Sequence, residues 1–205
     1  MTSPAFAKRF FTLPTFAVSA RGLFAQANEL HATLARQALP RTLSEKIMLA
    51  VTRVNGCRYC SYAHARLALQ AGVSETELCD LLKGEFGHIP PHERTALLFA
   101  QHYAEQGGRY DAGAWQKLED TYGADAARDM LVHIRLITFA NLYGNTFDAL
   151  LERLRLRPVA GSRFFAEIVV LSAGATIVPL GLFIALITRR LSAVRTRRLV
   201  RVNRD

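Results

Sequence analysis

The sequence contains few cysteines and little that would build a β-sheet. Only three of the 205 residues are cysteine, too few for a chain held together by a framework of disulfides. Strands of an antiparallel sheet alternate polar and apolar residues between turn signals, and that pattern is absent, as is any internal repeat. Helical periodicity fills the chain instead, and we therefore predict an all-α fold.

Glycine and proline interrupt the helical pattern and set the expected boundaries. Ser74 and Glu77 match a capping box, and Asn55-Gly56 is typical of a turn between two helices. We expect helices over residues 20–37, 43–54, 57–71, 74–83, 91–105, 111–122 and 124–154.

Positive charge is concentrated in the last quarter of the chain. Residues 1–152 carry 15 Lys and Arg against 15 Asp and Glu, whereas residues 153–205 carry 11 Arg against two acidic residues. The whole net charge of +9 therefore lies in the second segment. Residues 168–187 hold no charged side chain and would extend roughly 30 Å as a helix, enough to cross a bilayer. Seven Arg follow within residues 189–205, as is typical of a tail beside anionic headgroups.

These features predict four parts of the chain: an N-terminal lead-in (1–19), a helical domain (20–160), a single transmembrane helix (168–187) and an Arg-rich tail (188–205). We expect the domain to face the cytoplasm, because the N-terminal apolar run is short and interrupted by Thr and Pro. A buried core helix or a peripheral hairpin is the alternative for residues 168–187. The tail lacks interleaved aromatic residues, so we expect no nucleic-acid partner.

Reactive side chains are concentrated in residues 45–64. Cys57 and Cys60 are three residues apart, His64 follows four residues later, and Glu45 precedes Cys57 by twelve residues. Positions three and four apart share one helix face, so the two thiols and the imidazole are expected together. Antiparallel docking of the preceding helix would bring the Glu45 carboxylate to the imidazole. In thiol redox chemistry one thiolate attacks the substrate and the second thiol closes a disulfide, while an imidazole and a carboxylate can transfer protons. These four side chains therefore predict a thiol redox site.

Other uses of the cysteine pair fit the sequence less well. A zinc site would need a fourth ligand, and His88 and His92 lack ligand-like spacing. A c-type haem requires His directly after the second cysteine, where this chain has Ser61. A structural pair of buried thiols stays open as an alternative. We expect Cys79 to pack without a catalytic role, because its surroundings are those of an amphipathic helix.

The pattern of Glu45, eleven residues, Cys57-x-x-Cys60, three residues and His64 resembles the signature of one known family. That family is the alkylhydroperoxidase D branch of the carboxymuconolactone decarboxylase-like proteins. Residues 41–78 are similar to its core and residues 134–146 to a later helix, and the resemblance covers roughly residues 20–150. It implies a helical bundle like that of alkylhydroperoxidase D.

The resemblance also implies an activity, the reduction of hydroperoxides to alcohols by a thiol peroxidase. By that resemblance Cys60 attacks the peroxide, Cys57 resolves the product as a disulfide, and Glu45 and His64 form a proton relay. A lipoyl or thioredoxin-like partner would then reduce the disulfide, and no cofactor is expected. Self-association is common in the family, so we expect a homo-oligomer.

This chain departs from the family pattern at one position. The best-studied members carry His just before the second cysteine, where this chain has Tyr59. The change removes a proton-handling side chain. It therefore favours a second hypothesis more strongly than in members that carry the complete motif: a membrane-tethered disulfide or redox-sensing module without peroxide turnover. A third hypothesis is an acid–base enzyme such as a lactone decarboxylase. The cysteine pair argues against it, because the decarboxylase branch lacks that pair.

Overall fold

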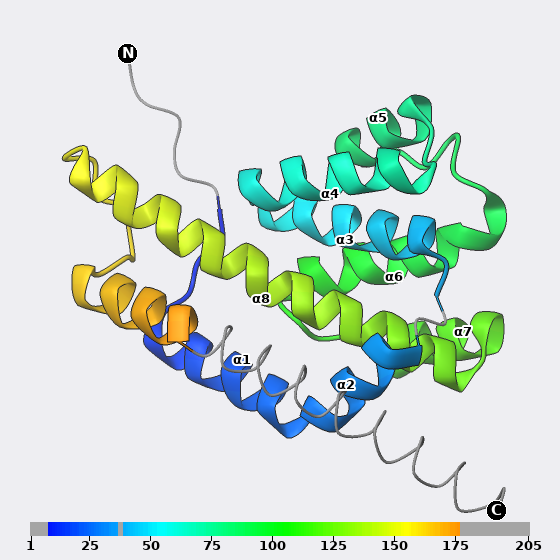
Figure 1. The fold of residues 1–205 in the computed structure, drawn as a ribbon, viewed down its shortest axis with the longest axis horizontal. Coiled ribbons are helices and arrows are strands. Elements are labelled where there is room, and N and C mark those ends of the chain that lie inside the picture. The colour runs from blue at the N-terminus through cyan, green and yellow to red at the C-terminus, as the bar shows by residue number, and fades with distance from the viewer. Residues whose placement is uncertain (1–7, 37–38, 177–205) are drawn as a thin grey trace, which may run out of the picture.

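The protein is helical wherever its structure is described. The computed structural model describes residues 8–36 and 39–176, and its regular secondary structure there consists of α-helices (Figure 1). Eight helices have both ends in that part of the chain, and a further helix begins at residue 164 and continues to residue 176. The eight are α1 (Leu13–Ala25), α2 (Ala27–Arg36), α3 (Arg41–Asn55), α4 (Arg58–Ala71), α5 (Glu75–Lys83), α6 (Pro91–Glu105), α7 (Ala112–Tyr122) and α8 (Ala124–Leu154). The predicted all-α fold is confirmed.

Helix boundaries from α3 onward follow the predictions to within two residues. Left-handed glycines end three of these helices, since Gly56, Gly72 and Gly84 all have positive φ and take the position after the last helical residue. The expected Ser74–Glu77 capping box opens α5.

The N-terminal region was predicted wrongly in two respects. α1 begins within the expected lead-in, because Thr12 and Thr15 form a capping box and Pro14 occupies the first turn. The single helix expected over residues 20–37 is in fact divided at Gln26, which ends α1. The Gln26 side chain accepts a hydrogen bond from Arg135 of α8, so the break between α1 and α2 is tied to the longest helix.

α3 is the central helix of the larger core, and Ile47 and Val51 on it are completely buried. It packs on α4, α5, α6 and α8. α8 runs through the molecule, with α3, α4, α5 and α6 on one side of it and α1 and α2 on the other (Figure 1). A second, smaller core forms on the α1 side of α8 from Phe11, Phe16, Phe139 and Val170.

Residues 164–176 pack on the domain through one helix face. Val170 is buried in the smaller core, and the hydroxyl of Tyr143 on α8 donates to the Leu171 carbonyl oxygen over 2.8 Å. Arg153 holds the buried Glu167 carboxylate at 2.9 and 3.0 Å. The first nine residues of the expected 168–187 span therefore belong to a helix that docks on α8.

Within the described residues, none of the helices combines the length and the hydropathy that crossing a bilayer requires. The rest of the expected span, residues 177–187, and the Arg-rich tail, residues 188–205, lie outside the described residues.

Candidate active site

The turn between α3 and α4 places Cys57 at the start of a helix. Gly56 adopts φ 71°, a left-handed conformation that glycine accepts without strain, and its N–H donates to the Thr52 carbonyl oxygen. Cys57 follows as the N-cap of α4, and its sulfur accepts from the backbone N–H of Cys60 at 3.4 Å. The sulfur thus occupies the position where a helix N-terminus favours negative charge.

The two thiols of the pair lie against each other. Their sulfur atoms are 2.9 Å apart and both cysteines are free. That separation exceeds a disulfide bond by roughly 0.9 Å, so a small movement of one side chain would allow the bond to close. Cys57 is completely buried, whereas Cys60 is partly exposed. Solvent therefore reaches the second cysteine and not the first.

The hydrogen bond between the thiols makes them electrostatically unequal. The side-chain hydrogen bond with Cys60 lowers the pKa of Cys57 from 9.0 to about 7, against a smaller opposing effect of burial, and the backbone N–H groups of Tyr59 and Cys60 lower it further. The same hydrogen bond, together with burial, raises the pKa of Cys60 far above its ordinary value. The negative charge of the pair therefore resides on Cys57, and Cys60 holds the shared proton.

Glu45 and His64 form a second pair, from α3 and α4. The Glu45 carboxylate lies 2.7 Å from Nδ1 of His64, and both side chains are largely buried. The expected antiparallel docking of the two helices is present and brings these groups together. A carboxylate on one ring nitrogen fixes the orientation of the imidazole and leaves Nε2 for another partner. A proton path from Nε2 to Cys60 stays a prediction.

Tyr59 is held by a polar cluster on the surface of α4 and α8. Its hydroxyl donates to Asp148 over 2.7 Å, and Arg58 and Lys8 contact the same carboxylate at 2.6 Å each. Burial raises the pKa of Tyr59, and the Asp148 carboxylate raises it further. Burial also raises the pKa of Asp148, but hydrogen bonds from Lys8 and Tyr59 outweigh it and leave a lowered pKa. The Tyr59 proton is thus directed to Asp148 and is retained at neutral pH.

α8 closes the site behind Cys57 at a glycine. A Cβ atom placed on Gly144 would lie 2.9 Å from the Cys57 sulfur and 3.5 Å from the Tyr59 ring. Any larger residue would push the sulfur out of its position, so the close approach of α8 depends on glycine. Two asparagine side chains of α8 tie it to the end of α3: Asn145 donates to the Asn55 carbonyl oxygen, and Asn141 donates to the Thr52 hydroxyl.

The structure thus places the four predicted residues in two contacting pairs, and adds three that the sequence did not suggest. Asp148, Gly144 and Lys8 come from segments more than 45 residues away from the cysteines, and no spacing in the sequence links them to the motif. Cys79 is exposed, and His88 pairs with Asp80 at 2.7 Å. Across residues 8–36 and 39–176, no three His, Cys, Asp or Glu side chains are grouped so that they could hold a metal ion.

The comparison with protein families agrees with this geometry. Residues 21–100 match the model of the carboxymuconolactone decarboxylase family. This segment is therefore similar to the domain of that family, over less than half of the 205-residue chain. The match covers α2 to α5 in full, with all four site residues, and also the end of α1 and the greater part of α6. A search among curated proteins finds no match to the chain.

The family includes enzymes, and the Cys57–Cys60 pair lies inside the matched segment. The match does not distinguish the alkylhydroperoxidase D branch from the rest of the family. The resemblance to that branch rests only on the residue pattern from Glu45 to His64.

Proposed function

We propose that the chain is a thiol-dependent hydroperoxide reductase of the alkylhydroperoxidase D type. The observation that supports it best is the arrangement of two free sulfurs 2.9 Å apart at the start of α4, with a hydrogen-bonded carboxylate–imidazole pair on the adjoining turns. A buried thiolate, an accessible thiol and a proton-handling pair are the components that a two-cysteine peroxidase requires.

Cys60 is the sulfur that meets the peroxide, because access decides between the two. The lowered pKa favours Cys57 as the attacking thiolate, whereas the greater exposure favours Cys60. A peroxide oxygen cannot reach the sulfur of Cys57, because that residue has no exposed surface. The short contact resolves the conflict, since the Cys57 thiolate can take the Cys60 proton as the peroxide approaches. Cys60 then becomes the thiolate at the moment it is needed.

The reaction divides into three balanced steps. The Cys60 thiolate attacks the outer oxygen of R–O–OH, the O–O bond breaks, and R–O⁻ takes a proton supplied through His64 and Glu45 to leave as the alcohol. Cys60 is now a sulfenic acid. Cys57, which now holds the proton it took from Cys60, attacks that sulfur and passes the proton to the departing hydroxide, so that the S–O bond breaks and water leaves as the disulfide forms. A lipoyl or thioredoxin-like dithiol then reduces the disulfide by thiol–disulfide exchange and is itself oxidised.

A second function is favoured by the environment of Tyr59. Its hydroxyl is committed to Asp148, so this side chain supplies no proton to the thiols. A redox-sensing disulfide module needs only the reversible Cys57–Cys60 bond and no rapid proton delivery to an alkoxide. The two functions differ in turnover, not in whether the disulfide forms.

Membrane attachment is part of the proposal. Residues 164–176 form a helix that leads toward the uncharged stretch up to residue 187, and Arg residues lie on both sides of that stretch. Residues 168–176 dock on α8, so we propose that the part of the predicted span after Thr176 attaches the chain to a membrane, with the domain on the cytoplasmic side and a homo-oligomeric assembly. Carbonate extraction of full-length protein and of a chain ending at Thr176 tests it: release of both into the supernatant contradicts the attachment.

Steady-state peroxide consumption tests the enzymatic proposal. Organic hydroperoxide is supplied with dihydrolipoamide or a thioredoxin system, and the wild type is compared with single Cys→Ser variants. Loss of turnover in Cys60→Ser and in Cys57→Ser, with full turnover in the matched control Cys79→Ser, supports a peroxidase. Absence of turnover in the wild type, together with a disulfide that forms and is reduced, supports the redox module. Unchanged turnover in Cys60→Ser contradicts its role in the attack.

A further inference from the structure

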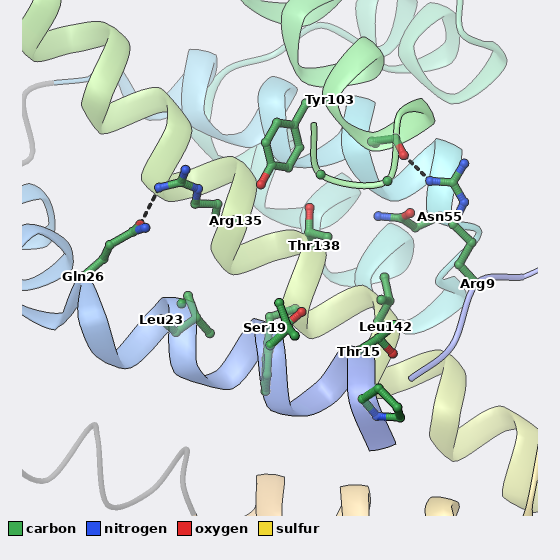
Figure 2. A pocket seen from close by; sticks show the side chains of 17 residues that line it. Arg9, Thr15, Ser19, Leu23, Gln26, Asn55, Tyr103, Arg135, Thr138 and Leu142 are labelled. Atoms are coloured by element: carbon green, nitrogen blue, oxygen red, sulfur yellow. Dashed lines mark hydrogen bonds between the residues drawn. The ribbon is translucent and has the colours of Figure 1, made fainter. Parts of the chain in front are cut away.

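A cavity of about 510 Å³ lies between α1, α8 and the C-terminal ends of α3 and α6 (Figure 2). Its size falls in the range of small-molecule sites, roughly 300–1,000 Å³. Thr15, Ser19 and Gly22 line it from α1 at helical spacing, and Gln26 lines it from the C-cap, which means that one face of α1 forms a wall. Phe139 and Leu142 form part of the wall on α8.

The charge of the lining is of one sign. Two guanidinium groups, of Arg9 and Arg135, line the cavity, and none of its described lining residues is acidic. Arg9 donates to the backbone carbonyl oxygens of Ala104 and Glu105, and Arg135 donates to the side-chain oxygen of Gln26. These partners are neutral groups, so the positive charge facing the cavity is not compensated by a carboxylate on its walls. An anion would supply that compensation.

Asn55 presents an unused donor to the same cavity. Its side chain is 1% exposed, and its Nδ2 has no hydrogen-bond partner within the described structure. Figure 2 shows the amide pointing toward Thr138 across the cavity. A buried donor without a partner is destabilising, and an acceptor atom on a ligand would satisfy it.

We propose that this cavity binds a small organic carboxylate with an aliphatic body. The carboxylate accepts from the Asn55 amide and lies in the positive field of Arg9 and Arg135, while the hydrocarbon packs on Leu23, Phe139 and Leu142. This inference is independent of the proposed peroxidase, because it requires no reaction at the thiols. The site nevertheless adjoins the thiols along the chain, since Asn55 is two residues before Cys57.

Isothermal titration calorimetry on the purified full-length chain tests this, with octanoate as the probe and octan-1-ol as its uncharged match. We expect octanoate to bind at least about tenfold more tightly than the alcohol, because a hydrogen bond to a charged group contributes about 1.5–3 kcal/mol. Equal affinity for the two probes, or absence of octanoate binding, would overturn the proposal.

Filling the cavity gives a second, separate test. A Cβ atom on Gly22 has no heavy atom within 4 Å, so Gly22→Leu extends into open space from the wall-forming face of α1. Its matched control is Ala17→Leu, which adds a similar side chain at an exposed position of the same helix that does not line the cavity. Octanoate affinity should fall at least about tenfold in Gly22→Leu and stay unchanged in Ala17→Leu. Equal affinity of both variants and wild type would overturn the proposal.

The charge can be removed without changing the shape greatly. Arg135→Gln should weaken octanoate at least about tenfold and leave octan-1-ol unaffected, which brings the two probes to similar affinity. This variant decides the matter if circular dichroism shows that Gly22→Leu does not fold. Undiminished preference for octanoate in Arg135→Gln would contradict the electrostatic part of the proposal.

Discussion

Removing the Cys60 thiol should raise the pKa of Cys57 by about two units. The largest cause of the lowered Cys57 pKa, from 9.0 to about 7, is the hydrogen bond from Cys60, which Cys60→Ala deletes. Burial of Cys57, which raises its pKa, and the backbone N–H groups of Tyr59 and Cys60, which lower it, both remain in the variant, so the pKa should return to about its ordinary value of 9.0. At pH 8 the thiolate fraction of Cys57 would then fall from roughly nine-tenths to roughly one-tenth.

The ultraviolet absorbance of the thiolate, followed against pH under reducing conditions, measures this shift. Both proteins carry Cys79→Ser, so that this exposed third thiol does not contribute to the absorbance. A Cys57 titration midpoint near pH 7 in both proteins would refute the claim that the second thiol stabilises the first as a thiolate.

The same shift predicts how stability depends on pH. The folded-state pKa of Cys57 lies below its unfolded value, so its ionisation stabilises the fold above pH 9 and loses that effect as the pH falls through about 7. Two pKa units correspond to about 3 kcal/mol as an upper limit. The raised pKa of Cys60 opposes this gain above pH 9, because folding then disfavours its ionisation. Urea unfolding at pH 7 and at pH 8.5 should show the wild type gaining stability with pH, and Cys60→Ala not gaining it.

Four other substitutions test the geometry around the pair. Gly144→Ala places a Cβ atom 2.9 Å from the Cys57 sulfur, so we expect it to destabilise the domain by about 1–3 kcal/mol in urea unfolding and to slow disulfide formation; unchanged values for both would contradict the close packing of α8. Glu45→Gln and His64→Gln should each slow peroxide turnover by about 10²–10⁴-fold with the melting temperature nearly retained, and full-rate turnover would remove that residue from the relay. Asp148→Asn keeps the shape of a buried acceptor and removes its charge, so we expect a loss of about 1–3 kcal/mol in stability with the thiol titration of Cys57 little changed, and a stability equal to wild type would show that the cluster carries no net energy.

Local signals carried most of the helix predictions. Gly56 and Gly72 end helices because their left-handed conformation satisfies the last carbonyl groups, and a single-residue rule finds them. The pairing of Glu45 with His64 also followed from the sequence, because two adjacent helices joined by a short turn must dock antiparallel. The part of the site that lies within residues 45–64 was therefore predictable.

The contributions of α8 and of the N-terminal segment were not predictable in this way. Asp148 and Gly144 meet the cysteines only because the three-dimensional packing brings α8 across the start of α4, and their own sequence neighbourhood gives no sign of it. The break at Gln26 depends similarly on a contact with Arg135, 109 residues away. The difference in pKa between the two thiols required the sulfur–sulfur distance, which spacing alone does not determine.

A single-turnover experiment with one equivalent of organic hydroperoxide tests the central claim most directly. The reduced full-length chain is mixed with the peroxide, the remaining thiols are counted, and the linked peptides and the alcohol product are identified by mass spectrometry. We predict the loss of two thiols per chain, a peptide pair joined through Cys57 and Cys60, and one equivalent of alcohol. A chain that retains both of these thiols while Cys79 is oxidised, or one that forms the disulfide without releasing alcohol, would contradict the peroxidase proposal.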